Sequence, residues 1–297
     1  PWRSFPTMVA SGLLIGLLTG GFPAYAREIS QVMLVVATTF ALTEISFIGI
    51  SPRAEIRWFL LALGTSYGVL GGLVLAFAAV APEPAIHDGW VLIAAVPPAI
   101  AVVPITSYLK GDTRRTLISL AILYLLGLLL VPAITYAFTH QSVPLQDLVF
   151  QTALLIGLPI LVSRPLRRWR KVESFRVSAV CVSFCVLVIA IVGSTRATLL
   201  SRTDLLISLA VLSFVRTFAL GSGILVVSRA LRLRRAEQVA ATAFSSFKNL
   251  GLTVVLAFSI FGPDATLPAV VSLVLEIAWL GTLPLLLRAR PAAAAPT

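Results

Sequence analysis

A lysine in the middle of an apolar stretch is the residue of this sequence that most clearly could take part in chemistry. The stretch runs from about residue 236 to residue 261, and its centre also carries two serines and Asn249. A transmembrane helix needs roughly 20 mostly apolar residues, so the stretch is long enough to cross a bilayer. An ammonium group at the centre of such a helix costs at least about 2.5–3.5 kcal/mol. Lys248 must therefore face protein, water or a ligand.

A second apolar stretch contains three prolines, at Pro97, Pro98 and Pro104. Each proline removes an amide donor and clashes with the preceding turn, so the three together should break a helix. The backbone groups that such a break frees are tolerated at membrane depth only inside protein or beside water. We predict a broken helix here that faces the segment around Lys248. A kinked packing helix is the alternative.

The ends of two broken helices would present free N–H groups and the positive ends of helix dipoles, which suit an anion. Lys248 would add its charge, and hydroxyl and amide groups nearby would donate hydrogen bonds. A lysine that reaches toward the membrane surface is the alternative for this position. The predicted substrate-binding set is Pro98, Pro104, Thr106, Ser107, Ser245, Ser246, Lys248 and Asn249.

Three further charged residues fall inside predicted spans, namely Glu44, Arg216 and Glu276. Together with Lys248 they make two cations and two acids, so their charges could cancel in pairs. The first pairing we expect is Lys248 with Glu276, because their spans are consecutive in the chain, and Glu44 is the alternative acid. The pair could be permanent, or it could open and close with substrate or proton. A buried Lys or Glu can shift its pKa by several units, which would suit a proton carrier.

These residues must be positioned by membrane-spanning helices. The chain has 297 residues, of which 58% are hydrophobic and only 12% are charged. Soluble domains carry about 25% charged residues. We predict an all-α polytopic membrane protein without a soluble domain or a signal peptide, and with a disordered tail at 291–297. The ten predicted spans are 6–25, 29–50, 56–81, 90–109, 115–138, 146–163, 175–195, 203–228, 236–261 and 265–288.

The Lys and Arg residues are unequally divided between the two sides of the membrane that the predicted spans define. With ten spans, eighteen of the 23 Lys and Arg residues fall on one side and three on the other, while Arg216 and Lys248 lie inside spans. Lys and Arg mark the cytoplasmic side of a membrane protein. We therefore expect a multi-pass protein of the plasma (inner) membrane with both termini in the cytoplasm. The net charge of +11 indicates topology and contact with membrane lipids rather than a nucleic-acid partner.

Ten spans divide into two halves of five, at 1–139 and 140–290, and an odd number per half makes the halves inverted. Span 1 contains Gly12-Leu-Leu-Ile-Gly-Leu-Leu18, and span 6 contains the similar Ala153-Leu-Leu-Ile-Gly-Leu-Pro159. In transporters built from inverted repeats the site lies near the midplane, on interrupted helices in matching positions. Spans 4 and 9 fit that description.

The cysteines and histidines give no sign of a metal, a cofactor or an enzyme. Cys181 and Cys185 share one helix face, as small packing residues would. A metal site would need more ligands nearby. His87 and His140 fall in loops without a metal-spaced cluster or a nucleophile–base pair. We therefore predict neither a metal nor a cofactor, and no enzymatic activity.

Two parts of the sequence resemble a known family. One runs from Ala94 to Pro132 and includes Tyr108-Leu-Lys-Gly-Asp112, and the other is Phe247-Lys-Asn-Leu-Gly-Leu252 followed by Val274-Leu-Glu-Ile277. They resemble the bile acid/arsenite/riboflavin transporter (BART) superfamily, which includes bile acid–sodium symporters and arsenite permeases. The resemblance covers nearly the whole chain. It implies ten helices, with broken helices 4 and 9 crossing in a core domain, a panel domain of the remaining helices, and alternating access by movement between the two.

The departures from the family pattern bear on the coupling ion. The symporters bind sodium partly through a Ser-Asn pair in span 4, where this chain has Val103 and Pro104, and through a Glu in span 9, where it has Phe244. The Gln of their Met-Gln-Asn pattern is Lys248 here. A fixed ammonium in that place would supply the positive charge that a bound sodium ion otherwise provides, and it would repel sodium. The arsenite permeases carry a Cys after the span-4 proline, where this chain has Ala99.

Together these observations predict a secondary active transporter for a small organic anion, independent of sodium and driven by protons or by exchange. Lys248, with Arg216, would offset the charge of the substrate, and Glu276 or Glu44 would respond to protons. An arsenite or oxyanion efflux permease that works without the usual Cys is one alternative. A transporter-like receptor that binds a ligand without moving it is another.

Overall fold

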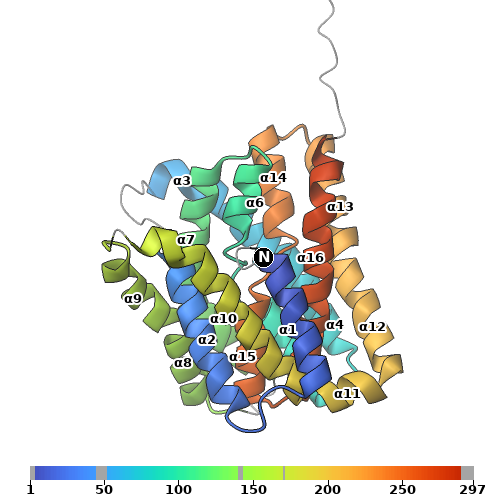
Figure 1. Ribbon diagram of the computed structural model, residues 1–297. Helices are drawn as coiled ribbons and strands as arrows, with labels where there is room; N and C mark the ends of the chain where they lie inside the picture. Colours follow the sequence, from blue (N-terminus) through green and yellow to red (C-terminus); the bar gives the residue numbers. More distant parts are fainter. Residues whose placement is uncertain (1–3, 45–51, 140–142, 170, 289–297) are drawn as a thin grey trace, which may run out of the picture.

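The structure is a computed structural model that describes residues 4–44, 52–139, 143–169 and 171–288. Every regular element within these ranges is a helix, and the β-type pairing found there is an isolated bridge between Pro98 and Lys248. Figure 1 shows the helices packed side by side in a single bundle. The prediction of an all-helical protein is therefore confirmed for the described residues.

The described part of the first half of the chain contains four continuous helical segments and one broken pair. Its elements are α1 (Phe5–Thr19), α2 (Ala26–Leu42), α3 (Pro52–Leu63) continued by the π-helix η1 (Gly64–Gly71) and α4 (Gly72–Ala79), the pair α5 (Pro84–Ala95) and α6 (Val102–Tyr108), and α7 (Thr113–Phe138).

The second half follows the same order. Its elements are α8 (Leu145–Thr152) continued by the π-helix η2 (Ala153–Gly157) and α9 (Leu158–Leu166), α10 (Val172–Ser194), the short α11 (Arg196–Ser201), α12 (Thr203–Phe214) continued by the π-helix η3 (Val215–Ala219) and α13 (Leu220–Ala230), the pair α14 (Arg235–Phe244) and α15 (Leu250–Ile260), and the 3₁₀ turn η4 (Asp264–Thr266) with α16 (Leu267–Arg288).

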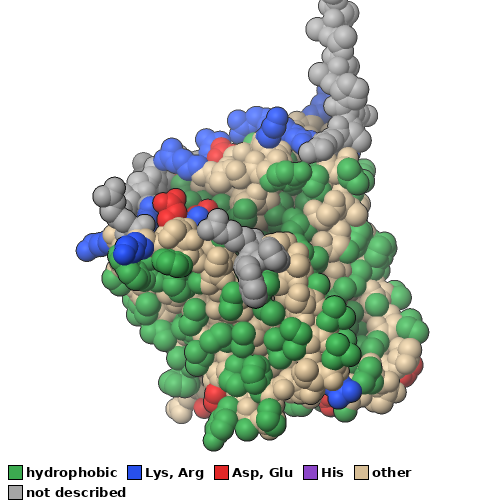
Figure 2. Space-filling view, in the orientation of Figure 1, with side chains coloured by type: hydrophobic (Ala, Val, Ile, Leu, Met, Phe, Trp, Pro, Cys, Tyr) green, Lys and Arg blue, Asp and Glu red, His purple; other side chains and the backbone are tan. Residues whose placement is uncertain are grey.

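The helices have the length and composition of membrane spans. Among the described residues, six helical segments are long and apolar enough to cross a bilayer: Glu55–Ala79, Thr113–Phe138, Leu145–Leu166, Val172–Ser194, Thr203–Ala230 and Asp264–Leu287. The protein is therefore an integral membrane protein with several spans. Its Lys and Arg side chains gather where α3 and α14 begin and α6 ends, above a largely hydrophobic surface (Figure 2). We call this the basic end.

The helices pack in two groups. Helices α1, α2 and α10 and the segment α8–α9 pack against one another, and we call them the panel group. The two broken pairs pack with α3, α4, α7, α12, α13 and α16, and we call this the crossing group. The family resemblance places the helices other than the broken pairs in a panel domain. Among the described residues, α3, α4, α7, α12, α13 and α16 pack with the broken pairs or with one another.

Glycines allow the backbones of the panel group to approach closely. A Cβ atom added at Gly193 in α10 would lie 2.3 Å from the Cα of Gly21, in the turn that follows α1. The obstacle is backbone, which cannot rotate away. We expect Gly193→Ala to lower the free energy of unfolding by about 1–3 kcal/mol, as overpacking does. Denaturation in detergent micelles measures the change.

Gly223 in α13 provides the matched control, because a Cβ atom added there meets open space. Gly223→Ala should be neutral or should stabilise the protein by roughly 0.5–1 kcal/mol through helix propensity. Equal stability of the Gly193→Ala and Gly223→Ala variants would show that the close approach in the panel group does not exist.

Candidate functional site

The first broken helix is interrupted by two of its three prolines. Helix α5 ends at Ala95 because Pro97 and Pro98 have no amide hydrogen, which leaves the carbonyl groups of the last turn of α5 without their usual donors. Pro104 does not contribute to the break. It lies in the first turn of α6, where an amide hydrogen has no partner within the helix and proline is tolerated.

Side-chain hydrogen bonds frame the interruption of the second broken helix. Helix α14 ends at Phe244, and the hydroxyl groups of Ser245 and Ser246 donate to the carbonyl oxygen of Thr242 at 3.1 and 2.8 Å. Helix α15 begins after Asn249, whose Oδ1 accepts the amide hydrogen of Leu252 at 3.1 Å. Asn is among the favoured residues for this capping position.

The two interruptions cross each other. The amide of Ala99 donates to the carbonyl oxygen of Phe247 at 3.3 Å, and the amide of Asn249 donates to the carbonyl oxygen of Pro97 at 3.0 Å. These bonds form the bridge between Pro98 and Lys248 and hold the two interruptions together. Helices α6 and α14 lie on the basic side of the crossing, and α15 lies on the other side (Figure 1).

The side chain of Lys248 lies inside the crossing group and is 1% exposed. Its Nζ donates to the carbonyl oxygens of Ala94 and Val96 at 3.0 and 2.9 Å. Pro98 would supply the helical donor for Ala94, so the ammonium replaces an amide hydrogen that the sequence lacks. The ammonium also faces the negative dipole end of α5 and lies 4.1 Å from the ring centroid of Tyr67.

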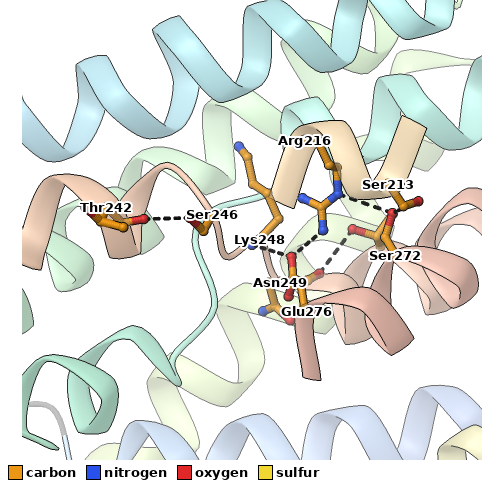
Figure 3. Close-up of polar contacts among 9 residues, drawn as sticks. Ser213, Arg216, Thr242, Ser246, Lys248, Asn249, Ser272 and Glu276 are labelled. Carbon is orange, nitrogen blue, oxygen red and sulfur yellow. Dashed lines mark hydrogen bonds and ion pairs between the residues drawn. The ribbon is translucent and has the colours of Figure 1, made fainter. Parts of the chain in front are cut away.

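Glu276 pairs with Arg216, and the ion pair that the sequence suggests with Lys248 is wrong. Arg216 is fully buried, its Nη2 bonds to Oε1 of Glu276, and its Nε donates to Ser272 at 3.2 Å. Lys248 reaches Glu276 only through its backbone amide, at 3.1 Å. In Figure 3 the Lys248 side chain extends away from Glu276. The break sets the backbone amide and the side chain of Lys248 on opposite sides of the chain, and the sequence carries no signal of that direction.

A cavity of about 640 Å³ lies between the panel group and the crossing. Its inner part is formed by the two interruptions and by Glu276 of α16, and its outer part by Glu44, Tyr108 and Arg176. The outer residues lie at the end of α2, the end of α6 and the start of α10, so the cavity reaches toward the basic end. Phe184 and Val180 of α10 form much of the panel wall.

Residues 23–278 match the SBF-like CPA transporter family. The chain belongs to this family. The match covers most of the chain, so the resemblance to the BART superfamily that the two broken segments carry is confirmed. No match was found among curated proteins. Membership of a transporter family makes this protein a transporter of the bile acid/arsenite type, and it places the activity in transport rather than in catalysis.

The structure places Glu44 after the end of α2 and not in the buried interior, contrary to the prediction. Helix α2 ends at Leu42, and the Glu44 side chain is 45% exposed and lies 3.7 Å from Arg176. It is therefore not a buried partner for Lys248 in this member of the family. The predicted second span extends past the end of α2 at Leu42, because the apolar residues of the sequence continue beyond it. Residues 45–50 of that span lie outside the described residues.

The predicted substrate-binding residues divide into two sets. Pro104, Lys248 and Asn249 line the cavity, although the side-chain oxygen and nitrogen of Asn249 already bond to Leu252 and to the Tyr124 hydroxyl. The others do not line it. The Thr106 hydroxyl donates to a carbonyl oxygen of its own helix at 2.8 Å, and the Ser245 and Ser246 hydroxyls also donate to a carbonyl oxygen of the preceding helix. Ser107 is exposed outside the cavity, and Pro98 takes part in the bridge. Local bonds of this kind compete with any other use of a helical hydroxyl.

The end of the bundle opposite the basic end is joined by polar contacts between the two groups. Gln31 of α2 donates to Ser259 of α15 at 2.9 Å and also to Gln151 of α8 at 3.1 Å. Thr198 of α11 donates to Asp264 at 2.9 Å. The first contact joins the panel group to the crossing group, and α11 is the link between α10 and α12. No sequence pattern points to these residues, because each is an ordinary polar side chain near a helix end.

An ion pair lies at the same end, between Glu83 before α5 and Arg202 after α11. The hydrogen bond from Arg202 lowers the pKa of Glu83 below its usual value. Because the pKa is lowered in the folded protein, the pair adds stability above the pKa of an unfolded Glu. That contribution is lost as the pH falls through the folded pKa.

Proposed function

We propose that the protein is a secondary active transporter that carries a small organic anion by alternating access and without sodium. The observation that supports this most is the cavity of about 640 Å³ that ends on the crossing. Glu276 and Lys248 are among the residues at its inner end, and Arg216 lies behind Glu276, so two buried cations stand against one buried acid. An excess of positive charge in a cleft with low-dielectric walls attracts an anion and repels a cation.

The wall of the cavity favours an organic substrate. Apolar residues such as Ile100, Phe184 and Leu273 make up most of it. Ligand sites of this kind bind the apolar body of a molecule, while a few polar groups fix its orientation. Arsenite would leave the apolar wall unused, and Ala99 stands where arsenite permeases have a Cys. We therefore place the oxyanion permease second.

The surroundings of Lys248 support transport without sodium. Its ammonium bonds to the carbonyl oxygens of Ala94 and Val96, which are the kind of oxygen ligand that a metal cation takes. Val103 and Phe244 stand where the symporters have sodium ligands, and both are buried and apolar. In our proposal the ammonium of Lys248 lies on the side of the crossing away from the cavity, which we describe as behind the crossing. It attracts the substrate there as a fixed positive charge and does not touch it.

The order of the elements supports the inverted-repeat part of the proposal. In each half a helix with a π-helical segment, η1 or η3, precedes a broken pair, which is followed by a long helix. We propose that residues 1–139 and 140–290 form two inverted five-helix repeats, which gives ten membrane crossings. Movement of the panel group against the crossing group would then expose the cavity alternately. By the charge rule, the basic end and both termini face the cytoplasm of a cell with this protein in its plasma (inner) membrane.

Thermal stabilisation of the purified protein by organic anions and by arsenite, in sodium or in potassium, tests the proposal. A specific ligand at 100 times its Kd stabilises the folded state by about 2.7 kcal/mol. We expect an organic anion to stabilise the wild type equally in both salts and to be taken up by proteoliposomes. Lys248→Gln should lose this stabilisation and the uptake, because the fixed charge is gone.

Lys171→Gln is the matched control, because Lys171 is exposed at the start of α10, away from the cavity. It should behave as the wild type does. Stabilisation by sodium alone would contradict the fixed-cation argument. A response to arsenite only would support the oxyanion permease, and binding without uptake would support a receptor.

A further inference from the structure

Five buried oxygen atoms along α3, η1 and the first two turns of α7 have no hydrogen-bond partner among the described residues. They are Glu55 Oε2, Ser66 Oγ, Tyr67 OH, Thr116 Oγ1 and Ser119 Oγ. A buried polar group without a partner costs about 1–3 kcal/mol. Such groups in folded proteins are usually bonded to ordered water, and a buried water typically joins several of them. Helix α3 packs beside α7, and η1, which continues α3, packs beside α5 and α14. We call this set of five atoms, from α3 and α7 at one end to η1 at the other, the polar seam.

The outer end of the polar seam meets water at the basic end. Glu55 Oε2 lies 3.5 Å from Nε of Arg115, an ion pair that lacks hydrogen-bond geometry. Arg115 also lies 3.6 Å from Asp112, and its guanidinium sits 5.3 Å from the ring centroid of Trp58. The side chains of Arg115 and Asp112 are 36% and 30% exposed. Glu55 therefore reaches the solvent-exposed surface of the basic end through its contact with Arg115.

The inner end of the polar seam is the crossing itself. The Tyr67 ring covers the ammonium of Lys248 at 4.1 Å, and the Tyr124 hydroxyl of α7 accepts a hydrogen bond from Asn249 at 2.8 Å. Along the axis of α7, Ser119 follows Thr116 by about 4.5 Å and Tyr124 follows Ser119 by about 7.5 Å. Each interval is short enough for a few water molecules to bridge.

The polar seam is separate from the substrate cavity. None of its five residues lines that cavity. The cavity meets the crossing on the side of Glu276 and the panel group, whereas the Lys248 side chain extends to the other side (Figure 3). The charged groups that act on the ammonium are Arg216 and Glu276, of which Glu276 lines the cavity. The ring of Tyr67 lies against the ammonium itself.

We propose that a chain of ordered water fills the polar seam and connects the basic end with Lys248. The seam would give this ammonium aqueous contact that does not pass through the substrate cavity. It is also the route by which Lys248 can exchange protons: the ammonium passes one proton to the first water, the chain releases one near Glu55, and the reverse transfer restores it. The proposal extends the proposed function, in which Lys248 acts from behind the crossing.

Radiolytic hydroxyl labelling of the purified protein, read by mass spectrometry, tests the proposal because X-ray irradiation of ordered water labels the side chains beside it. Tyr67 is the reporter in the polar seam, and Tyr108, which is 64% exposed, reports the dose. We expect Tyr67 to be labelled well above Phe244, which is 1% exposed and lies away from the polar seam. Thr116→Val, which keeps the shape but removes the hydroxyl, should lower Tyr67 labelling severalfold and leave Tyr108 unchanged.

Ser119 offers a pair of variants that differ only in a hydroxyl. Ser119→Val should lower the labelling of Tyr67, and Ser119→Thr should keep it. Tyr67 labelling no higher than that of Phe244 in the wild type would overturn the proposal even if no variant folds. Unchanged labelling in both valine variants would overturn it as well. The experiment uses no substrate, so the water chain could stand even if sodium-coupled transport disproved the proposed function.

Discussion

Replacing Glu276 with Gln is expected to lower the free energy of unfolding by about 3–5 kcal/mol, because it leaves a buried charge without its partner. Arg216 is fully buried, and Glu276 supplies the single carboxylate bonded to it among the described residues. A neutral amide at this position can still accept the backbone hydrogen bond from Lys248, but it cannot balance the guanidinium. Chemical denaturation in detergent micelles measures the effect.

Transport should be lost together with the stability, because Glu276 joins three parts of the site. It pairs with η3 through Arg216, holds the crossing through the amide of Lys248 and lines the cavity. Glu83→Gln is the control, since it breaks an ion pair of the same chemistry at an exposed position. Exposed pairs contribute little, so this variant should keep both stability and transport.

A double variant separates the two consequences. Replacing the buried pair with apolar residues, as in Arg216→Met with Glu276→Leu, removes both charges and often restores stability. We expect the double variant to fold and to remain inactive. If Glu276→Gln alone were as stable as the wild type, Arg216 would have another acceptor, and the ion pair would not hold η3 to α16.

Sequence reasoning located both interruptions, because their causes are local. Pro97 and Pro98 remove amide donors, and Ser245, Ser246 and Asn249 offer side-chain bonds that end one helix and begin the next. Each cause acts within a turn or two of the chain. The same reasoning counted Pro104 as a third breaker, and it was wrong there because the effect of a proline depends on its place within the helix.

The partners of the buried charges could not be read in the same way. Lys248 and Glu276 are neighbours through a backbone amide, while the ammonium turns toward Ala94 and Val96. That choice depends on the backbone dihedral angles inside the break, which no pattern of residue types encodes. Tyr67, which covers the ammonium, stood in an apolar span and looked like any aromatic residue of a membrane helix.

Alternating access makes a second strong prediction, on the contacts of Gln31. This side chain donates to Ser259 of the crossing group and to Gln151 of the panel group, at 2.9 and 3.1 Å. If the two groups move against each other, the first contact must break during transport and the second need not. Gln31→Cys with Ser259→Cys, joined through disulfides by a short bis-thiosulfonate reagent, should therefore abolish uptake by proteoliposomes, and a reductant that cleaves the disulfides should restore it.

Gln31→Cys with Gln151→Cys is the matched control, because it uses the same residue and the same reagent but joins two elements within the panel group. It should transport at the rate of the wild type. Both pairs are made in a chain whose Cys181 and Cys185 have been replaced by Ala, since Cys181 lines the cavity and would react. Full uptake after the Gln31–Ser259 link would mean that the panel group and the crossing group do not separate at this end. Loss of uptake in the control alone would place the moving boundary inside the panel group, between α2 and α8.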